Sequence, residues 1–112
     1  MSSVYTPAFN RVRALLYPII IKLLGEYIAM DTMEIGKEIK KIKEEEKDKK
    51  KDFELVDFKW LSDYSYQING VLVDMVRHCI VDEVRDGYEL TAYGWKLAEN
   101  PKEMEELVKR IK

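Results

Sequence analysis

The spacing of apolar residues is most regular between residues 65 and 91, and it changes period once within that stretch. Up to residue 79, apolar residues recur at steps of three and four, as they do on one face of a helix. Residues 80–84 then form a short extended run, and residues 88–91 alternate apolar with polar. Asp86-Gly87 between these runs indicates a hairpin, because a two-residue type I′ turn needs positive φ at both positions. The stretch predicts a helix followed by a tight hairpin, and the buried helical face would consist of Ile68, Leu72, Met75, Val76 and Cys79.

The apolar pattern at the start of the chain predicts a first helix over residues 7–24. Thr6 is a typical N-cap, Pro7 suits the first helical position, and an apolar stripe follows as far as Gly25. Pro18 lies inside this stripe, where it removes a hydrogen bond to Ala14. We therefore expect the helix to kink or divide at Pro18.

A short strand over residues 27–29 and a second helix are expected next. Asp31 is followed three residues later by Glu34, which is the outline of a capping box at a helix start. The buried stripe of this second helix would continue with Ile35, Ile39 and Ile42.

The C-terminal segment, residues 92–112, predicts two more helices. Thr91 is a plausible N-cap for the first, and Asn100-Pro101 would end it and begin the second. A terminal amphipathic helix either pairs with its copy in another subunit or packs back on its own domain. We favour pairing in a homodimer, with an interface made of Met104, Leu107, Val108 and Ile111.

The order helix, hairpin, helix is typical of the second half of a winged helix-turn-helix domain, and the residues resemble a family with that fold. Residues 65–99 are similar to PadR-like and MarR-like transcription regulators, and residues 8–42 are loosely similar to them. The resemblance implies a single domain over 1–112, mainly α with a small β-hairpin (α+β), and repression at a promoter. Cys79 stands where the family usually has Gly; the matching hairpin exit consists of Tyr88, Leu90, Thr91, Gly94 and Leu97.

The sequence departs from this family between the second and third helices. A minimal helix-turn-helix joins its helices with about three or four residues, whereas residues 37–64 form a charged and then aromatic insertion here. Either an extra helix packs beside the core or the second helix is unusually long. The lysines of the charged part either form a solvated face or contact phosphate; interleaved glutamates favour the solvated face.

Composition limits the classes of function. The chain of 112 residues has a net charge of −2, which is unusual for a DNA-binding domain, because neutralising phosphate supplies much of the affinity. One cysteine and one histidine make a protein-built metal site improbable, and we expect no cofactor. No apolar run is long enough to cross a membrane, and no secretion signal is visible, so a cytoplasmic location is expected. The lysine and glutamate content, with a single glutamine, is the bias of hyperthermophile proteins.

Catalysis is not expected. His78 and Cys79 are neighbours on the predicted helix, so their side chains point about 100° apart and cannot form a nucleophile–base pair. The chain has no Gly-rich phosphate loop, no paired-histidine motif and no Ser-containing nucleophile elbow.

Base recognition is better supported by the residue types at the start of the third helix, which enters the major groove in a winged helix. Gln and Asn side chains can make two hydrogen bonds to adenine, and Ser or Tyr can reach phosphate. Asp74 is expected to face outward and repel phosphate, and Arg11, Arg13 and Lys96 are further backbone candidates. The predicted DNA-binding residues are Ser65, Tyr66, Gln67, Asn69, Gly70 and Val73 on the helix, with Lys59, Lys37 and Arg85 as phosphate contacts.

These patterns favour a homodimeric regulator that binds double-stranded DNA in a sequence-specific manner. The alternative is a winged-helix module for protein–protein interaction that has lost DNA contact, which the acidic balance favours. A small-molecule effector has only the apolar residues around Trp60 and Trp95 in its support.

Overall fold

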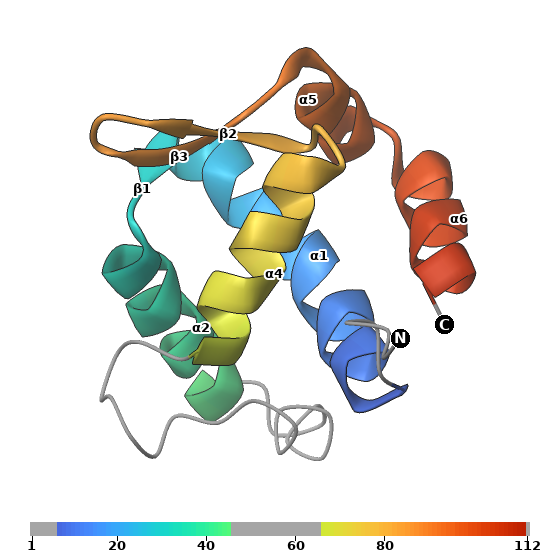
Figure 1. The fold of residues 1–112 in the computed structure, drawn as a ribbon, viewed down its shortest axis with the longest axis horizontal. Coiled ribbons are helices and arrows are strands. Elements are labelled where there is room, and N and C mark those ends of the chain that lie inside the picture. The colour runs from blue at the N-terminus through green and yellow to red at the C-terminus, as the bar shows by residue number, and fades with distance from the viewer. Residues whose placement is uncertain (1–6, 46–65, 112) are drawn as a thin grey trace, which may run out of the picture.

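The computed structural model describes residues 7–45 and 66–111, and within these ranges the chain is mainly helical with one small antiparallel sheet (Figure 1). The α+β class expected from the sequence is therefore confirmed. The helices are α1 (Pro7–Tyr27), α2 (Thr32–Glu45), α4 (Tyr66–Arg77), α5 (Ala92–Glu99) and α6 (Pro101–Ile111), and the strands are β1 (Ala29–Met30), β2 (Val81–Val84) and β3 (Gly87–Leu90).

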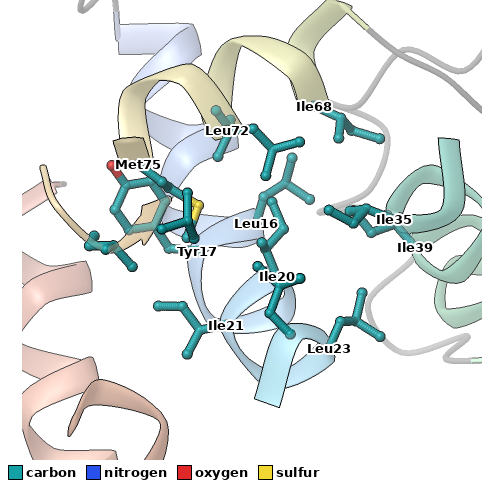
Figure 2. Close-up of a cluster of buried hydrophobic side chains, with 14 of the residues drawn as sticks. Leu16, Tyr17, Ile20, Ile21, Leu23, Ile35, Ile39, Ile68, Leu72 and Met75 are labelled. Carbon is teal, nitrogen blue, oxygen red and sulfur yellow. The ribbon is translucent and has the colours of Figure 1, made fainter. Parts of the chain in front are cut away.

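The hydrophobic core forms where α1, α2 and α4 meet (Figure 2). Helix α1 contributes Leu16, Tyr17 and Ile20, all of which are at most 1% exposed. The predicted stripes on the other two helices are confirmed, except for Cys79 at the end of the α4 stripe, which is exposed. Ile35 and Ile39 of α2 are fully buried and Ile42 is partly buried, and Ile68, Leu72 and Met75 of α4 are fully buried.

Helix α1 is longer than predicted and is not divided at Pro18. It runs on to Tyr27, so Gly25 lies within the helix instead of ending it. A Cβ at Gly25 would stand 3.9 Å from side-chain atoms of both Trp95 and Ala98. These distances are ordinary van der Waals contacts, so α5 packs against α1 at Gly25 without requiring a glycine there. Burial of the α1 side chains on both sides of Pro18 offsets the loss of one helical hydrogen bond.

The link from α1 to α2 contains the short first strand, shifted from the predicted residues 27–29 to Ala29–Met30. Ile28 has φ 60°, which is not an extended conformation, so the strand begins only at the residue after it. The predicted capping box at the start of α2 is confirmed. The Glu34 backbone N–H donates to Asp31 Oδ1 at 2.8 Å, and the Asp31 N–H donates to Glu34 Oε1 at 3.1 Å.

Helix α4 ends in a Schellman motif, which corrects the predicted place of Cys79 on the buried face. The Ile80 N–H donates to the Met75 carbonyl at 2.9 Å, and the Cys79 N–H donates to the Val76 carbonyl at 3.1 Å. Cys79 takes the left-handed conformation, φ 60°, and is exposed. The helical phase therefore stops two residues before Cys79, at Arg77.

The hairpin strands pair as predicted, but the turn lies one residue earlier than expected. Val84 faces Gly87, so the two-residue loop is Arg85-Asp86, and neither of these residues has positive φ. Gly87 has φ 135° and begins β3. A Cβ there would stand 2.3 Å from the Met30 carbonyl oxygen, so the glycine is needed where β1 pairs with β3 and not in the turn. The strand order is β1-β3-β2.

Thr91 caps α5 as predicted, and it also holds the start of β2. Its hydroxyl accepts from the Gly94 N–H at 3.0 Å and lies 2.5 Å from the Cys79 carbonyl oxygen, to which it donates. A Cβ on Gly94 would stand 2.2 Å from the Ile80 carbonyl oxygen. Thr91 and Gly94 thus both serve the close packing of α5 against the residues just before β2.

Helix α6 packs back on its own domain, against α1 (Figure 1). Ile111 is 8% exposed, and Met104, Leu107 and Val108 are partly buried against the core. This is the alternative that the sequence left open for the C-terminal stripe. A contact of these four residues with a second copy stays a prediction. In the described part of the chain, no helix combines the length and apolar character that a membrane span requires.

Candidate nucleic-acid interface

Few of the residues of α4 that were predicted to contact bases are well exposed to solvent. Val73 is 41% exposed, whereas Gln67 and Asn69 are half-buried. The Asn69 amide makes no hydrogen bond with any residue of 7–45 or 66–111, so its donors and acceptor are available. Ser65 and Lys59 lie outside the described residues, and Tyr66 is placed only as the first residue of α4.

Gly70 is half-buried and lies beside Phe9 of α1. A Cβ at this position would meet the Phe9 ring at 3.6 Å. This distance is ordinary van der Waals contact, so packing against α1 does not by itself require glycine there. The close approach of DNA to Gly70 stays a prediction.

Asp74 is the largest correction on α4. It was expected to face outward, yet it is 3% exposed and lies 2.6 Å from Arg13 Nε through Oδ2. The Tyr17 hydroxyl donates to the same carboxylate oxygen. Arg13 was expected on the exposed side of α1 and is only 8% exposed. The buried arc of α4 is wider than the sequence stripe suggested, because α1 covers the flank that carries Asp74.

Further contacts make this a polar network between α1 and α4. Arg13 donates to Asn10 Oδ1 at 2.9 Å, and its guanidinium lies 5.9 Å from the Phe9 ring centroid and 5.5 Å from that of Tyr17. His78 Nε2 lies 3.3 Å from Asp74 Oδ1. A buried carboxylate with these partners is electrostatically satisfied, and the geometry ties the orientation of α4 to that of α1.

The pKa values of Tyr17 and Arg13 are raised in this network. Burial, and after it the hydrogen bond to Asp74, raises the pKa of the Tyr17 phenol well above its ordinary value. The pKa of Arg13 is also raised. Burial by itself lowers that pKa, but hydrogen bonds to Tyr17 and Asp74 outweigh it. Arg13 therefore stays charged and Tyr17 stays protonated at neutral pH.

Helix α2 carries four lysines and four glutamates, and Arg77 is exposed in the last turn of α4 itself. Lys37 and Lys41 are exposed one helical turn apart, and Lys40 beside them is half-buried. Lys41 Nζ lies 3.3 Å from Glu38 Oε1, which reduces its net effect. Lys37 is exposed, and its contact with phosphate stays a prediction.

The hairpin is acidic. Arg85 is exposed at the turn, but Asp82, Glu83 and Asp86 are exposed beside it. Asp82 also stands directly opposite Glu89 across the strands. Like charges at such positions repel, and the hairpin as a whole offers a phosphate backbone more repulsion than attraction.

Other chemistry is sparse in the described residues. No group of three or more His, Cys, Asp or Glu side chains there could hold a metal ion. An open apolar groove lies between α1, α5 and the start of α6, with Pro18, Trp95 and Met104 in its lining and Lys22 among them. Trp95 was expected in such a setting, whereas Trp60 lies outside the described ranges.

Sequence reasoning missed the Arg13–Asp74 pair, whose members are 61 residues apart. The one available signal was the position of Asp74 directly before Met75 and three residues after Val71, both of which are fully buried.

Comparison with known proteins gives no match: no family profile, no curated protein sequence and no solved structure is significantly similar to this chain.

Proposed function

We propose that this chain is a winged helix-turn-helix domain that binds double-stranded DNA, with the start of α4 in the major groove, and that it regulates transcription as a homodimer. The observation that carries the proposal is the order of elements. Helix α1, strand β1, helices α2 and α4 and the hairpin follow one another, and the sheet order is β1-β3-β2. In helix-turn-helix proteins the second helix of the pair enters the major groove, and we infer the same role for α4.

The charge of α4 supports the proposal. Asp74, which on the surface would repel phosphate, is buried and paired with Arg13. Asn69 retains a free amide suited to adenine, and Val73 is exposed for contact with a thymine methyl group. Phosphate contacts fall to α2, chiefly to Lys37, because the hairpin carries more carboxylates than cations.

The test is a fluorescence anisotropy titration with duplexes selected from a random-sequence pool, repeated at several salt concentrations. Specific binding predicts that log K falls linearly with log salt, with a slope of about −0.9 for each phosphate neutralised. The Lys37→Ala variant should make the salt slope shallower by about one on every sequence. Asn69→Ala should relax the base preference and leave the salt slope unchanged.

Lys109→Ala is the matched control, because Lys109 is an exposed lysine on α6, away from α4. The control should bind as the unchanged protein does. Absence of binding to any duplex at low salt, or equal weakening by Lys37→Ala and Lys109→Ala, would refute the proposal.

A module for protein–protein interaction is the second candidate, because the hairpin bears four carboxylates, namely Asp82, Glu83, Asp86 and Glu89, against Arg85 alone. Failure to bind DNA, together with a folded protein by circular dichroism, would favour this function.

A further inference from the structure

Three exposed apolar side chains flank the edge strand β1. Tyr27 is 53% exposed, Ile28 is 71% exposed, and Met33, in the first turn of α2, is 54% exposed. Strand β1 is at the edge of the sheet, since it pairs only with β3. We call these three residues together with β1 the corner surface. In Figure 1 it lies on the same side of the molecule as the hairpin tip and α2, and away from α6.

The backbone conformation of Ile28 is strained, which lowers the stability of the folded protein. Its φ of 60° is in the left-handed region, which β-branched residues rarely occupy. Gly or Asn would take this conformation with less strain and would expose no apolar side chain to water. Folding alone gives no reason for an isoleucine there. Strain combined with exposed apolar area is typical of a contact surface.

A groove rich in carboxylates adjoins the corner surface. It lies between the start of α2 and the hairpin turn, and Arg85 is the one cation in its described lining. The tip is held against the end of β1, because a Cβ on Gly87 would stand 2.3 Å from the Met30 carbonyl oxygen and 2.6 Å from the Asp31 nitrogen. The carboxylates that line the groove are Asp31, Glu34, Glu83 and Asp86.

We propose that the corner surface and this groove form a docking site for a basic segment of another protein. In this site an aliphatic or aromatic residue of the segment covers Ile28, and its lysine or arginine side chains enter the groove. Charge complementarity favours a basic segment, because its lysine or arginine side chains would lie against the four carboxylates of the groove. Nucleic acid is excluded by the same charges. A second copy docked through the same surface would bring like carboxylates together, which disfavours it.

The probe is a set of three fluorescein-labelled nine-residue peptides. The first alternates lysine with leucine, the second has glutamate in place of lysine, and the third has serine in place of leucine. Anisotropy with the full-length protein measures affinity, and amide chemical shifts from NMR spectra locate the contact. We expect the first peptide alone to bind tightly, with shifts centred on residues 27–34 and 83–88.

Ile28→Asn is the decisive variant, because asparagine tolerates left-handed backbone and should leave the fold at least as stable. It should weaken the lysine–leucine peptide about tenfold or more, since burying an isoleucine side chain contributes roughly that factor. Glu83→Gln should weaken it by a smaller factor that vanishes at high salt. The matched controls are Val73→Asn, an exposed apolar residue elsewhere, and Glu105→Gln, an exposed carboxylate on α6; both should bind normally.

Several outcomes would overturn the proposal. These are equal binding of the glutamate peptide, equal binding of the serine peptide, shifts centred on α6, and unchanged affinity in Ile28→Asn. Concentration-dependent shifts of residues 27–34 without peptide would show that a second copy is the occupant. DNA affinity measured on the same Ile28→Asn sample should be unchanged, so failure of DNA binding and failure of peptide docking remain distinguishable.

Discussion

The left-handed residue at the end of α4 leads to a sharp stability prediction for Cys79→Gly. A non-glycine residue in this conformation costs about 1–2 kcal/mol, and glycine does not bear that cost. Glycine also increases the conformational entropy of the unfolded chain, which opposes the gain by about 0.4–1 kcal/mol. The Cys79 side chain is exposed, so no packing is lost. We expect the free energy of unfolding to rise by about 0.5–1 kcal/mol.

Urea denaturation followed by circular dichroism at equal protein concentration measures this change. The midpoint should rise without a change in slope, because the buried surface is the same. Cys79→Ala is the control, since alanine removes the thiol but keeps a Cβ at φ 60°, and it should be close to neutral. If glycine were no more stabilising than alanine, the strain assigned to this position would be refuted.

Three further changes test the network and the hairpin. Asp74→Asn should destabilise the fold by about 3 kcal/mol or more in the same urea assay, because it leaves the buried Arg13 charge uncompensated. Asp82→Lys should stabilise the hairpin by about 0.5–1 kcal/mol by replacing repulsion from Glu89 with attraction, and the gain should shrink in concentrated salt. The raised pKa of Tyr17 means that the native state keeps a proton the unfolded chain loses above about pH 10.0, so stability should fall as pH rises through that value, and less steeply in Tyr17→Phe.

The local elements of this fold could be predicted from sequence because their signals are local. The stripe of Ile68, Leu72 and Met75 is set by helical periodicity, and the Asp31–Glu34 box depends on backbone groups within one turn. Residues whose partners are distant in sequence were misplaced. Gly87 was assigned to the turn because Asp-Gly is a turn pair, whereas its conformation is required by the approach of β1.

The candidate site was predicted less well than the fold for the same reason. Whether a residue of α4 faces solvent depends on where α1 crosses it, and no periodicity within α4 contains that information. Gly70 and Asp74 fall on the covered flank, while Val73 between them is exposed. Cys79 shows the same limit at the end of α4. The helical periodicity predicted it on the buried face, whereas the left-handed backbone of the helix exit leaves it exposed.

The arrangement of charge separates the two proposed surfaces more clearly than the net charge of −2 does. Lys37 and Lys41 are exposed on α2, the negative charge of Asp74 on α4 is neutralised internally by Arg13, and four carboxylates line the groove between the start of α2 and the hairpin turn. A polyanion and a basic protein segment would therefore contact different residues of one small domain. The two surfaces are neighbours, because Met33 and Lys37 lie one helical turn apart on α2 and Arg85 lines the groove, so we expect DNA binding and peptide docking to be coupled. If DNA weakened the docking of the lysine–leucine peptide, linkage would require the peptide to weaken DNA binding by the same factor. The acidic hairpin would then be a point of coupling between the two surfaces.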